Sequence, residues 1–529
     1  MTRWNEGSIT DIAARPRFHR EATPVWLVTA CTLLGYRAPD LSKPFRYADL
    51  GCGTGLTALT VAATCPQAEI WGFDFNPANI EAARDLAAQA GLTNIRFMET
   101  SFAELAAMAA DALPRFDFMT AEAVLSAVSP ENQHHIHTLI GRQLRPGGIA
   151  YLGYAADTGW NEFVPLQTFM RMTFEAGSDA SDLAVPGIFE QFDQLKAGGA
   201  HYFQRNPILE HRIAELRRRA PADVAHEFLN QEWHALMFAD VADAMAEMKC
   251  DFLGRATLHE NIAAASVPPA MLPLLEDAAT LRIRETMQDI AAVTPYRRDV
   301  YRRGVTFMPV AEHRAALKAI TVMEMDRRAL PLLTWQGPVP ADPELYQPLI
   351  DALRQGPLTI AHAATLGPLA ECPLEEAADA VAMLISAGQA HPLPPSSVAS
   401  EARPWVARLN GAIIDGITRG EEMEYLVSPL LGAALAVTAT EALLIGALSQ
   451  GHMSQGHMSQ GHMAGHAPDT PEELIEAVLL AMRRGGRSMT RGGLPVDDPV
   501  EERALLREGL STLLEHRVPL FRALGLLTA

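Results

Sequence analysis

The residues with the clearest chemical potential are three alternating glycines with one acid before them and another downstream. Gly51, Gly53 and Gly55 lack the Cβ atoms that would keep the backbone away from a bulky ligand. Asp74 ends the next apolar run, where a carboxylate can accept both hydroxyl protons of a ribose. Asp49 stands before the turn and suits a ligand that carries positive charge. This spacing predicts a nucleoside site.

The turn departs from the dinucleotide-binding pattern. That pattern, Gly-x-Gly-x-x-Gly, requires glycine at position 56, where this chain has Leu56. An acid at Asp49 also has no role beside a pyrophosphate, whereas it suits a sulfonium nucleoside with an amino-acid tail. The alternative is a turn that only connects a strand to a helix, and Asp74 argues against it.

The elements that must position these residues alternate in type along residues 45–154. Short β-rich runs alternate with amphipathic helical stretches. This alternation indicates a parallel sheet covered by helices on both faces, which is a doubly wound, Rossmann-like α/β fold. Asn76 and Ser129 each precede a proline and predict helix starts, and Gly91 predicts the end of the first helix. We expect strands at 45–50, 68–75, 95–99, 116–121 and 149–154, and helices at 56–64, 79–90 and 131–144.

Three motifs in this order resemble the class I S-adenosylmethionine-dependent methyltransferases: residues 49–55, 72–77 and 144–148. The resemblance implies S-adenosyl-L-methionine as the cofactor. It assigns the methionine part to the glycine turn, the ribose to Asp74 and the adenine to Ser101 and Phe102. Ser101 stands where the family often has an acid, so we expect backbone and Phe102 to contact the adenine. The expected cofactor-binding residues are Asp49, Gly51, Gly53, Gly55, Asp74, Phe75, Ser101 and Phe102.

A second resemblance covers residues 202–304. It is to the methyltransferase regulatory domain, which in bacteria lies between a class I core and a C-terminal region, in an arrangement that includes protein lysine methyltransferases. The resemblance therefore implies a methyltransferase acting on lysine side chains of a protein substrate. Its motifs are at 202–207, 226–230, 238–241, 252–254 and 296–299, followed by Gly304.

The acceptor side of the site is less clearly marked. The loop at 121–129, which faces the methyl group in the family, lacks the aromatic residues often found there. Glu122, Tyr154 and Asp157 are candidates to take the proton of a lysine amine, whose usual pKa is about 10.4. Tyr154 and Trp160 are candidate walls. A small-molecule methyltransferase and a nonenzymatic, cofactor-binding interaction protein stay open as alternatives.

The domain organisation follows from changes in pattern. A cofactor-binding domain is expected over residues 1–160. An α-rich regulatory domain follows at 161–305, with 161–200 as its connector and 201–304 as a separate helical unit. A winged-helix-like region is expected at 306–448, with helices at 349–353, 360–366 and 374–385. The remaining parts are a linker at 449–467, built on a repeated Ser-Gln-Gly-His-Met sequence, and a helical segment at 468–529.

Composition excludes several classes of function. The 529 residues carry a formal charge of −20, which repels nucleic acid and favours lysine-rich protein partners. The five cysteines form no Cys-x-x-Cys pair, so neither a zinc cluster nor a disulfide framework is expected. Their number and spacing fit a protein of the reducing cytoplasm. The apolar residues 430–448 contain Glu441, which favours a buried, Ala-rich helix over a membrane span. The loop at 485–487 is not expected to bind RNA.

Histidines offer further ligands, but no metal site is predicted. His134 and His137 share a helix face, which we interpret as exposed surface because no third ligand is evident. For His226 and Glu227, core packing and helix capping are favoured over an acid–base pair. The histidines of the repeat could bind a transition metal, but a flexible linker is favoured; they are His452, His457, His462 and His466.

Overall fold

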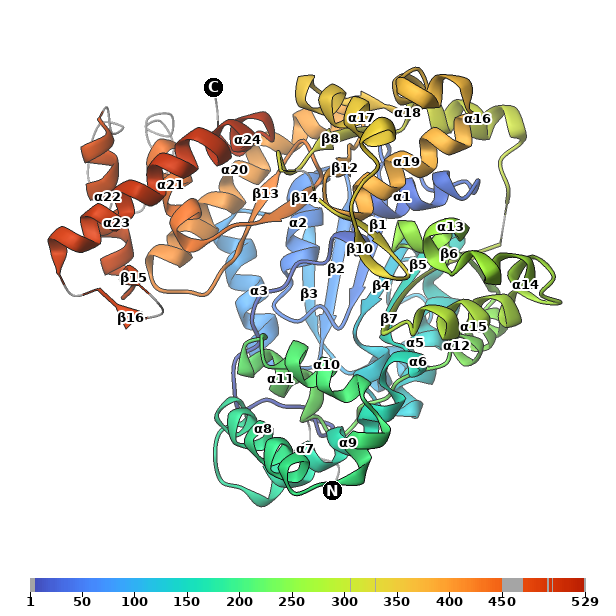
Figure 1. Cartoon of the computed structure of the whole chain (residues 1–529), viewed down its shortest axis with the longest axis horizontal. Coiled ribbons are helices and arrows are strands. Elements are labelled where there is room, and N and C mark those ends of the chain that lie inside the picture. The colour runs from blue at the N-terminus through green and yellow to red at the C-terminus, as the bar shows by residue number, and fades with distance from the viewer. Residues whose placement is uncertain are drawn as a thin grey trace.

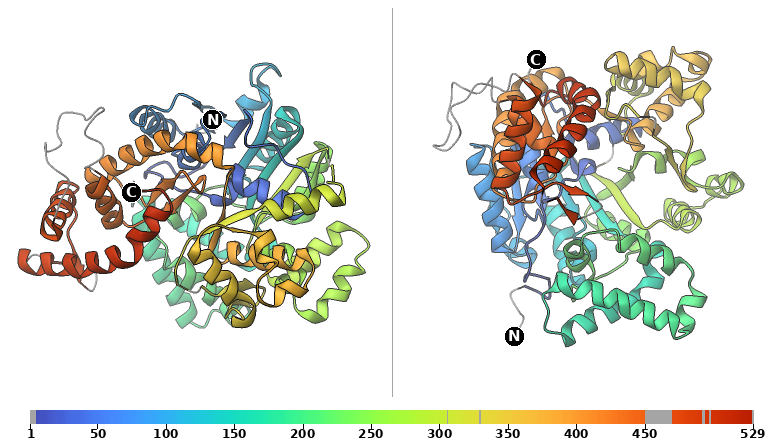
Figure 2. Two further views of the ribbon diagram at one scale, coloured as in Figure 1. Left: turned by 90° about the horizontal axis from the view of Figure 1, so that it is seen from above. Right: turned by 60° about the vertical axis from the view of Figure 1, so that its left-hand side comes forward.

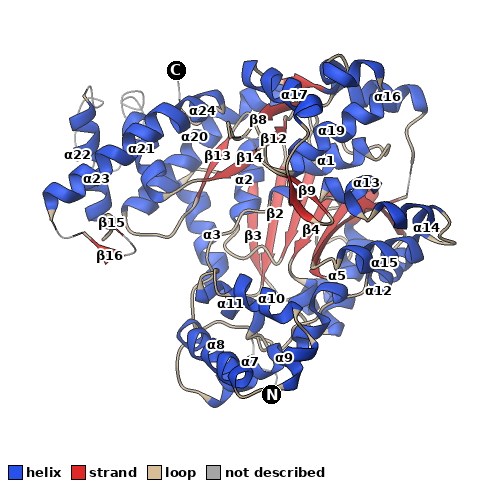
Figure 3. Ribbon diagram, viewed as in Figure 1, coloured by secondary structure: helices blue, strands red, loops and turns tan. Residues whose placement is uncertain are grey.

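The structure is a computed structural model that describes residues 5–304, 306–328, 330–449, 470–491, 494–496 and 498–527. Its centre is a seven-stranded sheet with the order β3-β2-β1-β4-β5-β7-β6 (Figures 1 and 3). The first five strands in that order are parallel, and β7 and β6 are antiparallel additions. The strands are β1 (Arg46–Leu50), β2 (Glu69–Asp74), β3 (Ile95–Glu99), β4 (Phe116–Glu122), β5 (Leu144–Ala155), β6 (Cys250–Arg255) and β7 (Tyr296–Arg303).

Helices cover both faces of this sheet, as expected for a doubly wound fold. On one face lie α1 (Pro24–Leu33), α2 (Leu56–Thr64) and α3 (Pro77–Gln89), and on the other lie α4 (Phe102–Ala107) and α5 (Pro130–Gln143). The predicted helix starts are confirmed, because the Asn76 side chain accepts from Ala78 N and that of Ser129 accepts from Asn132 N. Gly91, with a φ of +60°, follows α3 at the expected place. These local signals fix the direction of α3 and α5.

A helical module lies at one end of the sheet, below it in Figure 1, and the further views show the same arrangement (Figure 2). Its aromatic and aliphatic core includes Phe163, Phe192 and Phe228. The helices are α6 (Asp157–Trp160), α7 (Val164–Ala176), α8 (Ser181–Ala197), α9 (His201–Arg205), α10 (Ile208–Leu216) and α11 (Pro221–Phe228).

The expectation of a separate α-rich unit over 201–304 is wrong for two stretches, because β6 and β7 come from it and extend the central sheet. Buried charges connect the two strands to helix α15 (Leu281–Ala292). Arg297 forms ion pairs with Asp289 (2.7 Å) and Asp299 (2.9 Å), and Arg255 pairs with Glu285 (2.8 Å). Arg297 and Asp299 are fully buried, so each charge depends on its partners. Helices of this segment are α12 (Phe238–Glu247), α13 (Ala263–Ser266), α14 (Leu272–Glu276) and α15 (Leu281–Ala292).

In the region at 306–448, for which a winged-helix-like fold is predicted, helices pack with a three-stranded antiparallel sheet of order β11-β8-β12 before the long helix that starts at Ser396. The predicted helices near 349–353, 360–366 and 374–385 correspond to α17, α18 and α19. The elements are α16 (Val310–Ala319), β8 (Thr321–Glu324), β9 (Leu332–Thr334), β10 (Gly337–Val339), α17 (Pro343–Gln355), β11 (Leu358–Thr359), α18 (Ile360–Ala363), α19 (Leu374–Ser386) and β12 (Ala390–Pro392).

The C-terminal part packs along α2 and α3 through the long helix α20 (Ser396–Thr418) (Figure 1). Arg487, in the loop after α22, donates to the carbonyls of Ile417 and Glu421 (2.7 Å for Glu421), which are structural contacts. The other elements are β13 (Tyr425–Ser428), β14 (Ala433–Ala436), α21 (Ala439–Ser449), α22 (Pro471–Arg484), β15 (Thr490–Arg491), β16 (Leu494–Pro495), α23 (Pro499–Thr512) and α24 (Val518–Ala523).

The apolar stretch at 430–448 is buried, but it is only partly helical. Residues 433–436 are strand β14, and the helix begins at Ala439. The carboxylate of Glu441 is buried and is satisfied there by two contacts. It accepts from Thr438 N at the start of this helix and pairs with Arg517 (2.7 Å). Among the described helices, none is long and apolar enough to cross a membrane. The predicted linker falls, from residue 450 onward, outside the part of the chain that the structure describes.

Candidate functional site

The glycine turn connects β1 to α2 and is held by the neighbouring strand. The amides of Gly51 and Cys52 both donate to the carbonyl of Phe73, at 2.8 and 2.9 Å. Gly53, with a φ of +54°, lines a cavity, and a Cβ added there would meet no atom within 4 Å. Gly55 instead packs against Phe97 and does not line this cavity in the described structure. The bare backbone at Gly53 therefore leaves room for a ligand to lie against the turn.

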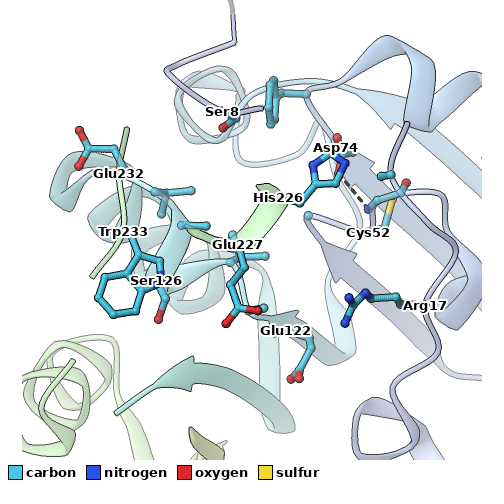
Figure 4. Close-up of a pocket in the computed structure, with 18 of the residues that line it drawn as sticks. Ser8, Arg17, Cys52, Asp74, Glu122, Ser126, His226, Glu227, Glu232 and Trp233 are labelled. Carbon is cyan, nitrogen blue, oxygen red and sulfur yellow. Dashed lines mark hydrogen bonds between the residues drawn. The ribbon is translucent and has the colours of Figure 1, made fainter. Parts of the chain in front are cut away.

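Asp74, at the end of β2, braces this turn. Its carboxylate accepts from the amides of Gly53 and Asn76, both at 2.9 Å, and from the Asn79 side chain at 3.3 Å. Burial raises the pKa of Asp74, and the bonds from Asn76 and Gly53 oppose that rise. The carboxylate lines the cavity (Figure 4) and has about four lone-pair positions, so three bonds leave one for a ribose hydroxyl. Asn76, not Asp74, caps α3.

Asp49 lies beneath the turn as a buried carboxylate. It accepts from Thr120 Oγ1 at 3.1 Å and is 7% exposed. Burial raises its pKa to about 7; the Thr120 bond opposes this rise, and the carboxylates of Glu122 and Asp74 add to it. A cation bound beside Asp49 would relieve this cost, which fits a sulfonium ligand with an ammonium group.

The expected adenine contacts begin helix α4. Ser101 and Glu104 form a capping box, in which Ser101 N donates to Glu104 Oε2 at 2.8 Å. Ser101 N is therefore already used within the protein. Phe102 is the first helical residue, whose amide has no partner within a helix, and its ring lines the cavity together with Phe75. These residues fit a flat adenine ring through apolar contact and a backbone N–H group.

Glu122 is the last residue of β4. Strand β1, which carries Asp49, lies between β4 and β2, which carries Asp74, and Glu122 lines the same cavity as both acids (Figure 4). It is 9% exposed and accepts a hydrogen bond from the Tyr151 hydroxyl. His19 Nδ1 lies 3.5 Å and Arg298 Nε 4.0 Å from its Oε1. Burial lowers the pKa of His19 below its usual value, although Glu122 acts in the other direction, and this shift favours the neutral imidazole.

Two predicted acceptor-side residues do not reach the cavity. Tyr154 is fully buried on the other face of β5 and donates to Asp299 at 2.5 Å. Asp157 begins α6, and neither residue belongs to the described cavity lining. Trp160 does line the cavity, where it packs edge-on against Trp233 with ring centroids 6.0 Å apart. The placement of Tyr154 and Asp157 is therefore a correction to the sequence interpretation.

The two histidine interpretations also need correction. His226 and Glu227 are only half-buried and line the cavity (Figure 4). His226 Nε2 lies 3.3 Å from the carbonyl of Ala13, and Glu227 pairs with Arg219. They neither pack in the core nor cap a helix. His137 is buried rather than exposed, and burial lowers its pKa to about 4. No group of metal-binding side chains occurs among the residues that the structure describes.

The cavity has a volume of about 1920 Å³ and extends from the glycine turn to the helical module. Residues 5–19 form no helix or strand and include a turn at 5–7; they supply part of the lining and are anchored by Ile9 N to Asn230 Oδ1 (2.9 Å) and by His19 N to Thr57 Oγ1 (3.1 Å). Sequence reasoning gave no role to many side chains of the lining, and four of them lie at or near the acceptor side. These are His19, Trp233, Tyr296 and Arg298. The motif at 296–299 marked two of them, but only as part of a domain resemblance.

The parallel sheet, the glycine turn and the acid at the tip of β2 define a class I methyltransferase, with S-adenosyl-L-methionine as its cofactor. Residues 41–177 match the family model described as "Methyltransferase domain", and residues 221–303 match "Predicted methyltransferase regulatory domain". The chain belongs to the same family as Uncharacterized protein sll1526 of Synechocystis sp., with 31% identity over 84% of this chain and 87% of that protein.

Two further proteins are similar over different lengths. Trans-aconitate 2-methyltransferase of Methylobacterium radiotolerans is 30% identical over 38% of this chain and 67% of its own length. The structure of PKMT2 from Rickettsia typhi in complex with AdoHcy has the same fold, with a TM-score of 0.68 and 16% identity over 98% of this chain and 100% of PKMT2. The fold match therefore includes the C-terminal region as well as the sheet.

Proposed function

We propose that the chain methylates lysine side chains of a protein substrate. The observation that carries this proposal is the cavity, because about 1920 Å³ exceeds the roughly 300 to 1,000 Å³ of a typical small-molecule site. It has room for a polypeptide segment beside the cofactor. Its described lining contains twelve carboxylates and five arginines, a surplus of acid that favours a cationic segment. The fold match to PKMT2 of Rickettsia typhi, whose structure is in complex with AdoHcy, supports the methyl-transfer part of the proposal.

The cofactor-binding roles follow from the geometry of the turn. Asp49 would face the charged methionine part, Asp74 the ribose, and Phe75 and Phe102 the adenine. The bound cofactor supplies a methyl group on a positively charged sulfur, which keeps the bonding electrons when the methyl leaves. The protein's task is to align the acceptor and to exclude water. Residues 5–19 and the helical module both contribute to the cavity lining, and we expect them to align the acceptor.

The acceptor must lose a proton before it attacks, since only the neutral amine has a free lone pair. Glu122 lies at the tip of β4, and the guanidinium of Arg298 lies beside it. Burial and the fixed positive charge of Arg298 disfavour the ammonium form of a lysine placed there, and they act against the Glu122 carboxylate, which favours it. Glu122 would accept an N–H of the amine, and neutral His19 could pass the released proton to water.

The test is transfer of a radiolabelled methyl group into bacterial lysate, with the products separated by size and then hydrolysed. The proposal expects label in protein and recovery of methylated lysine. Label in small molecules, label on another amino acid, or no label at all would contradict it. The Gly53→Ala variant serves as the negative control, because its methyl group would occupy the space against the turn. We also propose a cytoplasmic location, which the five free cysteines support.

A further inference from the structure

A buried hydroxyl without a partner lies on the acceptor side of the cavity. Tyr296 Oη is shielded from solvent and has no hydrogen-bond partner among the described residues. Burial raises the phenol pKa of Tyr296, and its neighbour Glu122 adds to that rise through its charge and through a weak side-chain interaction with the hydroxyl, although the pair falls short of regular hydrogen-bond geometry. An unsatisfied buried hydroxyl is costly, so its presence in a ligand cavity points to a bound group.

The hydroxyl and the carboxylate lie over one bare position of the sheet. A Cβ added to Gly153 would collide with Glu122 Oε2 and would lie 2.8 Å from Tyr296 Oη. Glycine therefore allows both oxygens to approach the same point from β4 and β7. Other groups around this point are the Tyr151 hydroxyl, which donates to Glu122, the His19 ring and the Arg298 guanidinium. Arg298 also stacks over the Tyr296 ring at 4.8 Å and holds it in place.

Two oxygen acceptors side by side match a neutral primary amine. Such an amine has two N–H donors and one lone pair, so two accepted hydrogen bonds leave the lone pair free and fix its direction. We propose that Tyr296 Oη and the Glu122 carboxylate form an amine seat, in which each accepts one N–H bond of the amine to be methylated. This inference deepens the proposed function, on which it rests for the identity of the amine.

The seat is tested by binding rather than by turnover. The full chain, loaded with S-adenosylhomocysteine, is titrated at pH 9 with n-butylamine, which mimics a lysine side chain, and with butyltrimethylammonium, which has no N–H group. Ligand-observed NMR gives both affinities. Tyr296→Phe should weaken n-butylamine about fivefold, the effect of one neutral hydrogen bond, and should leave butyltrimethylammonium unchanged. Affinity for S-adenosylhomocysteine should also be unchanged.

Two controls separate binding from structure. Tyr296→Phe should melt at or close to the wild-type temperature, because it removes a buried hydroxyl that forms no regular hydrogen bond in the described protein. Tyr202→Phe removes a hydroxyl that donates to the Glu162 carbonyl outside the cavity, and it should bind both amines as wild type does.

The seat and the proposed function fail in different ways. Wild-type protein that does not bind n-butylamine, or Tyr296→Phe protein that binds it equally well, overturns the seat even if lysine methylation is observed. If no protein lysine is methylated but n-butylamine binding depends on Tyr296, the seat stands and the lysine proposal is wrong.

Discussion

Cofactor affinity should depend on the protonation of Asp49. Burial raises the pKa of this carboxyl to about 7 in the free protein, and a cationic ligand requires the ionised form. The ionised fraction falls from about nine-tenths at pH 8 to about one-tenth at pH 6, so affinity should fall about tenfold over this interval. The ligand's own α-amino group, with a usual pKa near 8, becomes more cationic on acidification and would act in the opposite direction.

Isothermal calorimetry with S-adenosylhomocysteine, in buffers of different ionisation enthalpy, measures both the affinity and the protons released. At pH 7 about half a proton should leave the protein for each ligand bound. Asp49→Asn should bind more weakly at pH 8 and lose the dependence between pH 6 and 8. Affinity that stays constant or improves on acidification would refute the reasoning, as would an Asp49→Asn protein with the wild-type slope.

The same carboxyl predicts how stability depends on pH. The folded free protein holds the Asp49 proton more tightly than the unfolded chain does, so its stability contribution is lost as pH rises from about 4 to about 7. A bound cation offsets this loss. Saturating S-adenosylhomocysteine should therefore raise the melting temperature more at pH 8 than at pH 6, and an equal increase at both values would contradict the linkage.

Three substitutions test other parts of the structure. Asp74→Asn should weaken cofactor binding at least about tenfold by calorimetry, because charged hydrogen bonds are worth about 1.5 to 3 kcal/mol; wild-type affinity would show that the ribose role is wrong. Gly53→Ala should weaken the cofactor, whereas Gly486→Ala, which has a similar φ and open space but lies outside the cavity lining, should not; equal effects would mean that only backbone strain is measured. Arg297→Ala should lower the free energy of unfolding by about 3 to 5 kcal/mol in urea, against less than about 1 for Arg282→Ala in an exposed pair; similar losses would contradict the buried network.

The cofactor half of the site could be predicted because its information is local. The turn, Asp74 and the caps at Asn76 and Ser129 each depend on a few consecutive residues. Strands β6 and β7 could not be predicted in this way. Their sequences contain Arg255, Arg297 and Asp299. The two arginines are buried because Glu285 and Asp289 on α15 pair with them, and Asp299 is buried because it pairs with Arg297. From the sequence alone, a run of charged residues predicts exposed surface, because its buried partners are distant in the chain.

The acceptor half could not be predicted because its residues are far apart in sequence. Glu122 meets His19, Tyr151 and Arg298 only through the folded sheet. The sequence interpretation placed Tyr154 on the wrong face of β5. Successive strand residues point to opposite faces, so Tyr154 and Tyr151, three positions apart, lie on different faces, and it is Tyr151 that reaches Glu122.

The alternation of side chains along β7 gives this one strand two tasks. Tyr296 and Arg298 point to the cavity face, while Arg297 and Asp299 point to the opposite face and enter the buried ion network. The register places Tyr296 beside Ala155 and Arg298 beside Gly153, so the antiparallel pairing with β5 sets where both cavity residues stand. A domain that ended at residue 160 would keep the cofactor turn and Glu122. It would lose β7, and with it the cavity residues Tyr296 and Arg298. The regulatory segment is therefore part of the sheet that builds the site, and a boundary between sequence domains is not a boundary within this site.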